Sequence, residues 1–284
     1  MRPLGLAKGK IIDLTENVIP LEDRGHQFGD GIYEVTKVYN GKCFALDKHM
    51  ERAYRSLRQL KIPAVHTYEE FAEMHELLIT ESGITDGAIY MQITRGVAPR
   101  AHGFPENVVP CLTMSIRSTA PNSHLQASGV KALFIPDERW LRCDIKSLNL
   151  LGNVLGKQRA KEAGCFEAVQ IRNEVVTEGC SSNFFIIKDG ILWTHPLSNL
   201  ILNGITRSII VETIAPALDL TVLEKTFSPE FAHKADEAFI SGTTSEIMPV
   251  ISLSGAAVGD GKAGPVTKKI QNAYQSLIDE KCRH

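Results

Sequence analysis

The feature that most constrains the fold is a close series of short strand signals in the second half of the chain. Four such segments cover residues 167–171, 175–178, 184–187 and 191–194. The dipeptides Asn173-Glu174 and Asp189-Gly190 supply turns within this series, which is typical of antiparallel hairpins. Hairpins with helices elsewhere in the chain predict an α+β fold and not a doubly wound parallel sheet.

The first half also alternates between strand and helix patterns. Residues 35–39 alternate and are rich in β-branched side chains, and Asn40-Gly41 follows as a hairpin turn. Apolar residues between 50 and 60 recur at the helical period. Arg52 lies opposite that apolar stripe, so periodicity alone places its side chain in solvent.

Other elements follow from end signals. Thr67 with Glu70 forms a capping box that begins a second helix. Strands are expected at 89–93, 111–116 and 130–135, and a helix at 149–164. Further helices are expected to begin near Ile205, at Ser228-Pro229 and at Gly264-Pro265.

One stretch indicates a domain boundary. Residues 118–123 show no apolar periodicity and contain Pro121. We therefore expect a smaller N-terminal α/β domain at 1–118, a linker at 119–124, and a larger C-terminal domain at 125–284 with mostly antiparallel strands and flanking helices.

Composition excludes several classes of protein. The formal charge is −2, from 31 basic and 33 acidic residues, so no electrostatic argument supports nucleic acid or an anionic membrane as partner. No apolar run is long enough to span a membrane, and the first residues lack the apolar core of a secretory signal. The six cysteines form no C-x-x-C pair, which argues against a metal site and favours the reducing cytoplasm.

Two ionisable residues stand in contexts that favour burial. Lys146 lies among Ile145, Leu148, Leu150 and Leu151, where desolvation lowers a lysine pKa and frees the amine as a nucleophile. The simpler alternative is a lysine that extends to solvent at a helix start. Glu178 ends an apolar strand, where it either pairs with a cation or is simply hydrated.

Three polar segments are candidate anion sites. Residues 203–207 and 241–245 combine Gly, Ser and Thr, and backbone N–H groups at a helix start can bind phosphate. Ordinary helix capping explains the same residues. The loop at 95–102 presents Arg100 and His102, which can bind a carboxylate or remain hydrated. A lysine nucleophile, an acid and phosphate-type clusters together suit a Schiff-base cofactor with a phosphate, such as pyridoxal 5'-phosphate.

Six motifs carry a resemblance along nearly the whole chain. They are R-G-H-Q-F-G-D-G-I-Y-E-V (24–35), R-G-V-A-P-R-A-H (95–102), R-W-L-R-C-D-I-K-S-L-N-L-L (139–151), V-T-E-G-C-S-S-N (176–183), G-I-T-R (204–207) and T-T-S-E-I-M-P-V (243–250). The chain resembles the fold-type IV pyridoxal-phosphate aminotransferases, and among them the D-amino-acid aminotransferases. The pair Arg100 and His102 is the most specific mark of that group.

The resemblance implies a role for each candidate residue. Lys146 corresponds to the lysine that binds the cofactor as a Schiff base and transfers the proton in a 1,3-shift, and Glu178 to the acid that pairs with the pyridine nitrogen. The implied cofactor-binding residues further include Arg52, Ile205, Thr206, Thr243, Ser181 and Leu202. Tyr33, Arg100 and His102 correspond to a trap for the substrate α-carboxylate.

The resemblance also implies an assembly and a substrate. Arg100 and His102 are expected to reach the site from the other subunit of a homodimer, and the trap sets a preference for D-amino acids such as D-alanine, with 2-oxoglutarate or pyruvate as acceptor. Gly242 and Cys180 stand where serine is expected, and one lost hydroxyl contact weakens cofactor binding by about 1 kcal/mol.

Three other functions fit the same motifs. A branched-chain L-amino-acid aminotransferase shares the cofactor site without needing the Arg100 and His102 pair. A lyase acting on a chorismate-derived amine needs no 2-oxo acceptor. A protein that binds the cofactor without catalysis would complete no half-reaction with D-alanine.

Overall fold

The computed structural model describes residues 1–283. Contacts within the chain group these residues into two compact units. The first contains Met1–Ala120, Ile145–Asn149 and residues 278–283, and the second contains Pro121–Asp144 and Leu150–Leu277. We propose residues 119–124 as the linker between the domains at 1–118 and 125–284.

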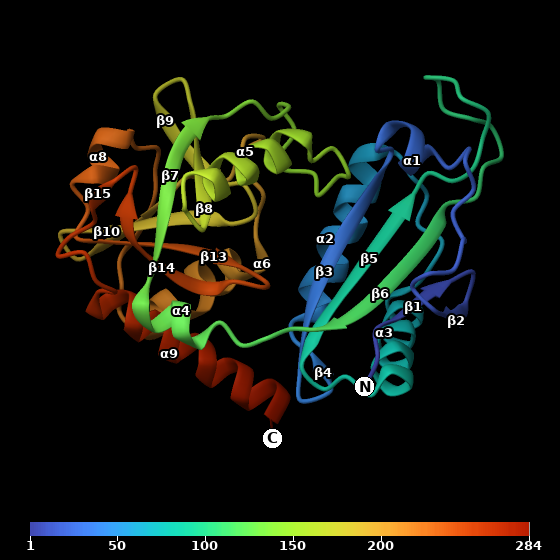
Figure 1. Ribbon diagram of the computed structural model, residues 1–284, viewed down its shortest axis with the longest axis horizontal. Coiled ribbons are helices and arrows are strands. Elements are labelled where there is room, and N and C mark those ends of the chain that lie inside the picture. Colours follow the sequence, from blue (N-terminus) through green and yellow to red (C-terminus); the bar gives the residue numbers. More distant parts are fainter. Residues whose placement is uncertain (284) are drawn as a thin grey trace. The chain divides into compact units, whose positions relative to one another are not determined.

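The first unit is built on a six-stranded antiparallel sheet with the strand order β2-β1-β6-β5-β3-β4. Helices α2 and α3 pack on this sheet, α2 on β3 and α3 on β1 and β6 (Figure 1). Its elements are β1 (Leu4–Ala7), β2 (Lys10–Ile12), α1 (Arg24–Phe28), β3 (Gly31–Tyr39), β4 (Lys42–Cys43), α2 (Leu46–Leu60), α3 (Tyr68–Ser82), β5 (Gly87–Thr94), β6 (Cys111–Ser118) and the terminal π-helical turn η2 (Asp279–Arg283).

Alternation along β3 decides which side chains reach the core of this unit. Ile32 and Val38 are fully buried in the cluster that includes Met50 and Leu57 of α2. Glu34 has the same parity as these residues and is also fully buried. Successive side chains of a strand point to opposite faces, so Tyr33 lies on the other face of the sheet from Glu34.

Two local predictions in this unit are confirmed. Asn40 and Gly41 both have positive φ, 48° and 74°, as the tight β3–β4 hairpin requires. At the start of α3, Glu70 N donates to Thr67 Oγ1 at 3.3 Å and Thr67 N donates to Glu70 Oε2 at 2.8 Å, which completes the capping box.

The second unit contains a nine-stranded sheet in the order β12-β11-β10-β13-β14-β7-β8-β9, with β15 paired to β14. The pairs β11–β12, β14–β7 and β7–β8 are parallel and the others antiparallel. Its elements are α4 (Ser123–Ser128), β7 (Val130–Pro136), α5 (Leu151–Glu162), β8 (Glu167–Arg172), β9 (Val175–Gly179), β10 (Asn183–Lys188), β11 (Ile191–Thr194), α6 (Ile205–Ile209), the π-helical turn η1 (Ile210–Ile214), α7 (Ala215–Ala217), β12 (Val222–Glu224), α8 (Pro229–His233), β13 (Glu237–Gly242), β14 (Glu246–Leu253), β15 (Ala256–Ala257) and α9 (Pro265–Ile278).

The predicted fold class is confirmed, and the four closely spaced strand signals are β8 to β11. The predicted helix start at Ser228-Pro229 is also confirmed, because Ser228 is the N-cap of α8 and its Oγ accepts from Phe231 N at 3.2 Å. Helix α5 is shorter than the expected 149–164. The central strands β13 and β14 were not predicted; most of their residues are buried, so neither shows the alternation that marks a half-buried strand.

Candidate active site

Lys146 lies in a segment that pairs with the start of β3 within the first unit. Tyr33 N donates to Lys146 O at 3.0 Å, and Leu148 N donates to Gly31 O at 3.0 Å. The backbone N–H of Lys146 also donates to Ser56 Oγ of α2 at 3.3 Å. These bonds fix the main chain at Lys146 beside Tyr33.

The Lys146 amine has an aromatic neighbour instead of an acidic one. Its Nζ lies 4.1 Å from the centroid of the Tyr33 ring, and the side chain is half-buried. No carboxylate among the described residues forms an ion pair with it.

Arg52 is buried, so the expectation from helical periodicity that it faces solvent is wrong. Its Nε and Nη2 each donate to Glu34 at 2.8 Å, one to each carboxylate oxygen. His49 Nδ1 lies 2.8 Å from Glu34 Oε2. Burial acts to raise the pKa of Glu34, but the Arg52 charge together with the hydrogen bonds from Arg52 and His49 outweighs it and holds that pKa well below its usual range. The bidentate pair therefore fixes the guanidinium of Arg52.

Arg100 and His102 are exposed on the loop between β5 and β6. Arg100 Cζ lies 4.9 Å from the centroid of the Phe28 ring, and the His102 ring centroid lies 5.5 Å from it. The two candidate carboxylate-binding side chains are thus gathered on one aromatic ring of α1.

Glu178 lies on β9 of the second unit and is 5% exposed. Its Oε1 accepts from Arg139 Nη1 at 2.5 Å. Its Oε2 accepts from Asn183 Nδ2 at 2.9 Å and from Leu202 N at 3.1 Å. The expectation of a buried carboxylate with a cationic and an N–H partner is therefore confirmed, whereas the alternative of a hydrated glutamate is not.

Burial raises the pKa of Glu178 to about 7, and the Arg139 charge opposes that rise. Arg139 is itself shared, because its Nε and Nη2 donate to Asp137 at 2.9 Å each. Burial acts to raise the pKa of Asp137, but the hydrogen bonds and charge of Arg139, together with a hydrogen bond from Arg172, lower it to about 2. Asp137 thus accepts two of the hydrogen bonds of Arg139, and Glu178 accepts only one. This arrangement leaves Glu178 able to bind a proton or a second cation.

The remaining predicted residues also lie in the second unit. Ile205 and Thr206 begin α6, whose start carries no side-chain cap, and Thr243 lies in the turn between β13 and β14. Leu202 N is bonded to Glu178. The Ser181 hydroxyl donates to the buried Glu167 at 2.8 Å, which leaves its oxygen as an acceptor only.

A family model described as amino-transferase class IV matches residues 31–253, well over half of the chain. The chain belongs to the class IV aminotransferases. This aminotransferase is 45% identical over 273 residues to D-alanine aminotransferase of Staphylococcus aureus (strain MW2), with 95% of this chain and 96% of the relative covered. It is 42% identical to D-alanine aminotransferase of Bacillus licheniformis, with 96% of each covered.

Solved structures agree with this membership. The branched-chain amino acid aminotransferase from Escherichia coli superposes with a TM-score of 0.89 at 27% identity, and covers 96% of this chain and 93% of that one. The branched-chain aminotransferase from Thermoproteus uzoniensis superposes with a TM-score of 0.88 at 26% identity, over 99% and 96% of the two chains. The resemblance found in the sequence motifs is therefore confirmed.

Sequence reasoning assigned no role to several partners of the predicted residues in this aminotransferase. Arg139 lies inside a quoted motif, but a lone arginine in sequence is usually exposed, so only the resemblance signalled it. Glu34 could have been found, because it shares the parity of Ile32 and Val38 on a predicted strand. Glu167 begins a strand, and nothing in the sequence indicates that it accepts three hydrogen bonds from Ser181 and Ser182.

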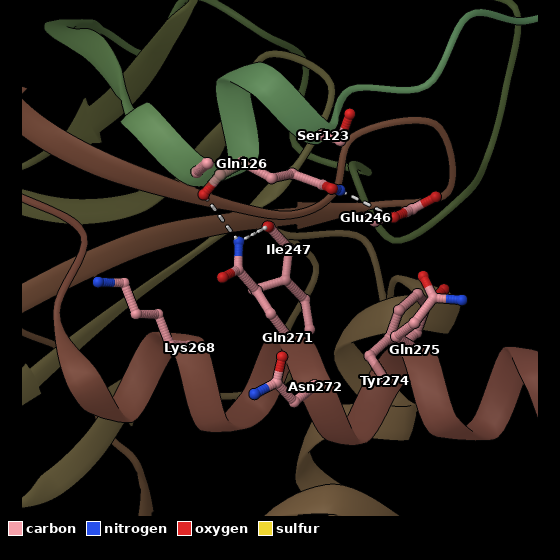
Figure 2. A pocket seen from close by; sticks show the side chains of 10 residues that line it. Ser123, Gln126, Glu246, Ile247, Lys268, Gln271, Asn272, Tyr274 and Gln275 are labelled. Atoms are coloured by element: carbon pink, nitrogen blue, oxygen red, sulfur yellow. Dashed lines mark hydrogen bonds between the residues drawn. The ribbon is translucent and has the colours of Figure 1, made fainter.

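A polar pocket in the second unit lies apart from all of these residues. Helices α4 and α9 and strand β14 line it, and Figure 2 shows the Gln271 side chain of α9 reaching toward Gln126 and Ile247. Gln271 Nε2 donates to Ile247 O at 3.0 Å, and Gln126 Nε2 donates to Glu246 Oε2 at 2.8 Å. None of the predicted site residues lines it, and its bonds join α9 to the sheet.

Within residues 1–283, none of the helices combines the length and apolarity that a membrane crossing needs. Nor do these residues bring together three or more His, Cys, Asp or Glu side chains in a group suited to a metal ion.

Proposed function

We propose that this class IV aminotransferase catalyses pyridoxal-phosphate-dependent transfer of the amino group between a D-amino acid, D-alanine first among them, and a 2-oxo acid such as 2-oxoglutarate or pyruvate. The observation that carries this proposal is the 45% identity over 95% of the chain to a D-alanine aminotransferase. The accessible Arg100 and His102 on their common ring support it.

The residues present fit pyridoxal 5'-phosphate by their chemistry. The cofactor has an aldehyde, a basic ring nitrogen and a phosphate, and the chain offers an amine beside an aromatic ring, a buried carboxylate and a fixed guanidinium. When bound, the cofactor supplies an electron sink that delocalises the charge left after loss of the substrate Cα proton.

Glu178 would hold the proton on the ring nitrogen of the cofactor. Its pKa of about 7 falls when a cation comes near, so contact with a protonated nitrogen keeps the carboxylate ionised. Arg139 and Asn183 each take one oxygen of this carboxylate and fix its plane. Leu202 N–H would act through the same carboxylate.

Lys146 would hold the cofactor covalently through Nζ, with loss of water from the cofactor aldehyde. Once the substrate amine has displaced it, Nζ would move the proton between the substrate Cα and the cofactor C4′. The flexible four-carbon side chain suits a base that serves two atoms. The fixed main chain at Lys146 and the nearby Tyr33 ring give that side chain a constant origin.

The phosphate would be held by charge and by N–H groups. Arg52 is fixed by Glu34, and the backbone N–H of Ile205 and the hydroxyls of Thr206 and Thr243 complete the proposed cradle. Ser181 would contribute its acceptor oxygen, and Gly242 lacks the hydroxyl that serine would bring there.

Tyr33, Arg100 and His102 would bind the substrate α-carboxylate, with Arg100 and His102 supplied by the second subunit of a homodimer. Large apolar side chains exposed on α5, at Leu151 and Val154, support a partner subunit. We also propose a cytoplasmic location, since none of the six cysteines forms a disulfide within the described residues.

An amino-donor panel tests the proposal. Both enantiomers of alanine and leucine are supplied with 2-oxoglutarate, and both enantiomers of glutamate with pyruvate, and D-alanine is expected to give the highest kcat/KM. Turnover of L-leucine alone would indicate a branched-chain aminotransferase. Pyruvate release from a chorismate-derived amine without acceptor would indicate a lyase, and spectral binding of the cofactor without any half-reaction would indicate a non-catalytic protein.

A further inference from the structure

The motif at 24–35 contains a short helix that the proposed chemistry leaves without a role. Helix α1 is capped by Asp23, whose Oδ1 accepts from Gly25 N at 2.8 Å and whose Oδ2 accepts from Thr94 Oγ1 at 2.9 Å. Gly29 ends the helix in the left-handed conformation at φ 66°. Phe28, the last helical residue, is therefore fixed relative to the end of β5.

The Phe28 ring contacts both charged side chains of the proposed carboxylate trap. The guanidinium carbon of Arg100 lies 4.9 Å from its centroid and the His102 ring 5.5 Å from it. Arg100 forms no ion pair with a carboxylate among residues 1–283. A ring face attracts a guanidinium without using its N–H donors, so those donors stay available to a substrate carboxylate.

Arg24 holds the main chain between the same two residues. It is 3% exposed, and its Nη1 donates to the carbonyl oxygen of Ala101 at 2.6 Å. Its Nε donates to Asp30 at 2.8 Å, and Arg95 donates to the same carboxylate. The Cζ of Arg24 also lies 4.7 Å from the Phe28 centroid. One buried arginine thus ties the exposed loop to α1.

We propose that Arg24 and Phe28 are positioning residues for the carboxylate trap: the Phe28 ring orients the side chains of Arg100 and His102, and Arg24 fixes the backbone between them. This inference rests on the proposed function, since it assigns the trap's geometry to α1. Both substrates carry an α-carboxylate, so loss of the ring weakens the binding of both.

Phe28→Leu tests the ring. It is expected to raise the KM for D-alanine and for 2-oxoglutarate by about 10-fold, the effect of roughly one cation–ring contact. The kcat, the affinity for pyridoxal 5'-phosphate and the cofactor absorption spectrum stay as in wild type. Phe28→Tyr restores the KM, because the ring face returns. Phe104→Leu is the matched control, since its ring contacts Arg95 instead.

Arg24→Lys tests the hydrogen bond from Arg24 to the backbone at Ala101. It also provides a second, independent test of the proposal if Phe28→Leu does not fold. Lysine keeps a charge beside Asp30 but lacks the separate donor that Nη1 of Arg24 directs to Ala101 O, so the KM rises while the thermal midpoint changes little. A combined Phe28→Leu and Arg100→Ala variant is expected to raise the KM by less than the product of the two single effects, because part of the effect of the ring passes through Arg100 and only the rest through His102.

The outcomes separate this inference from the function on which it rests. Wild-type enzyme without transaminase activity toward D-amino acids would overturn both. An active wild type with unchanged KM values in Phe28→Leu and Arg24→Lys would overturn only the positioning role. The positioning role would also be overturned if Phe28→Leu raised the KM as much in the Arg100→Ala background as in wild type. The same holds if Phe28→Leu lowered the affinity for pyridoxal 5'-phosphate as much as the affinity for the substrate.

Discussion

Two buried glutamates lie beside arginines, yet their pKa values move in opposite directions. Glu34 accepts two hydrogen bonds from Arg52 and also contacts the His49 ring. Together these partners stabilise its ionised form by more than burial destabilises it. Glu178 has a single bond to Arg139, which is already paired with Asp137. Asp137 takes two donors of Arg139 and is paired with Arg172 as well. Glu178 therefore keeps one bond to a cation, and a cationic ring nitrogen would supply a second.

The raised pKa of Glu178 predicts a stability change with pH in the enzyme without cofactor. The folded state holds this proton up to about pH 7, whereas the ordinary value is 4.5, so the free energy of unfolding falls as pH rises through that window. Glu178→Gln mimics the protonated form. Between pH 4.5 and about pH 7, the free energy of unfolding of wild type should therefore fall by on the order of 3 kcal/mol relative to that of Glu178→Gln. Urea unfolding at a series of pH values measures this difference.

Glu174→Gln in the adjoining exposed turn serves as the control and should follow wild type at every pH. Parallel profiles of wild type and Glu178→Gln would mean that burial does not raise the pKa of this carboxyl group. Saturating pyridoxal 5'-phosphate should remove the difference in slope, because the bound cation keeps Glu178 ionised.

At the scale of elements, α2 is joined to β3 by a buried ion pair as well as by apolar packing. Glu34→Gln leaves the buried guanidinium of Arg52 without its counter-ion, and breaking such a pair costs about 3 to 5 kcal/mol. We expect a loss of that size in the free energy of unfolding, together with weaker binding of the cofactor phosphate. Glu51→Gln, an exposed position of the same helix, should change neither, and an equal effect of both variants would contradict the assigned role of Glu34.

The same elements show what sequence patterns can and cannot predict. Turn and cap chemistry is local, so the Asn40-Gly41 hairpin and the Thr67 capping box were predictable from a few residues. Helical periodicity counts only apolar side chains, so it placed the buried Arg52 in solvent. Strands β13 and β14 escaped detection because burial removes their alternation.

The candidate site depends on contacts between distant segments of the chain. Lys146 pairs with β3, and Glu178 pairs with Arg139 and Leu202, yet no local pattern relates these positions. Each residue was identified by type and motif, and the resemblance supplied the roles. The residues that pair with them, mainly Arg139 and Glu34, can be identified only from the three-dimensional structure.

At the scale of the whole molecule, the proposed exchange of Arg100 and His102 between subunits can be tested by complementation. Lys146→Ala should abolish turnover, and Arg100→Ala should be nearly inactive at low substrate concentration. In a mixed dimer, the subunit that retains Lys146 would receive Arg100 from its partner, so one of its two sites is complete. Random co-assembly should then restore roughly a quarter of the wild-type activity, measured on co-expressed subunits with two different tags.

If each subunit instead used its own Arg100, neither site of the mixed dimer would be complete and mixing would restore nothing. Recovery near a quarter would therefore require both a dimer and a trap that crosses it, whereas size-exclusion chromatography alone reports only the first.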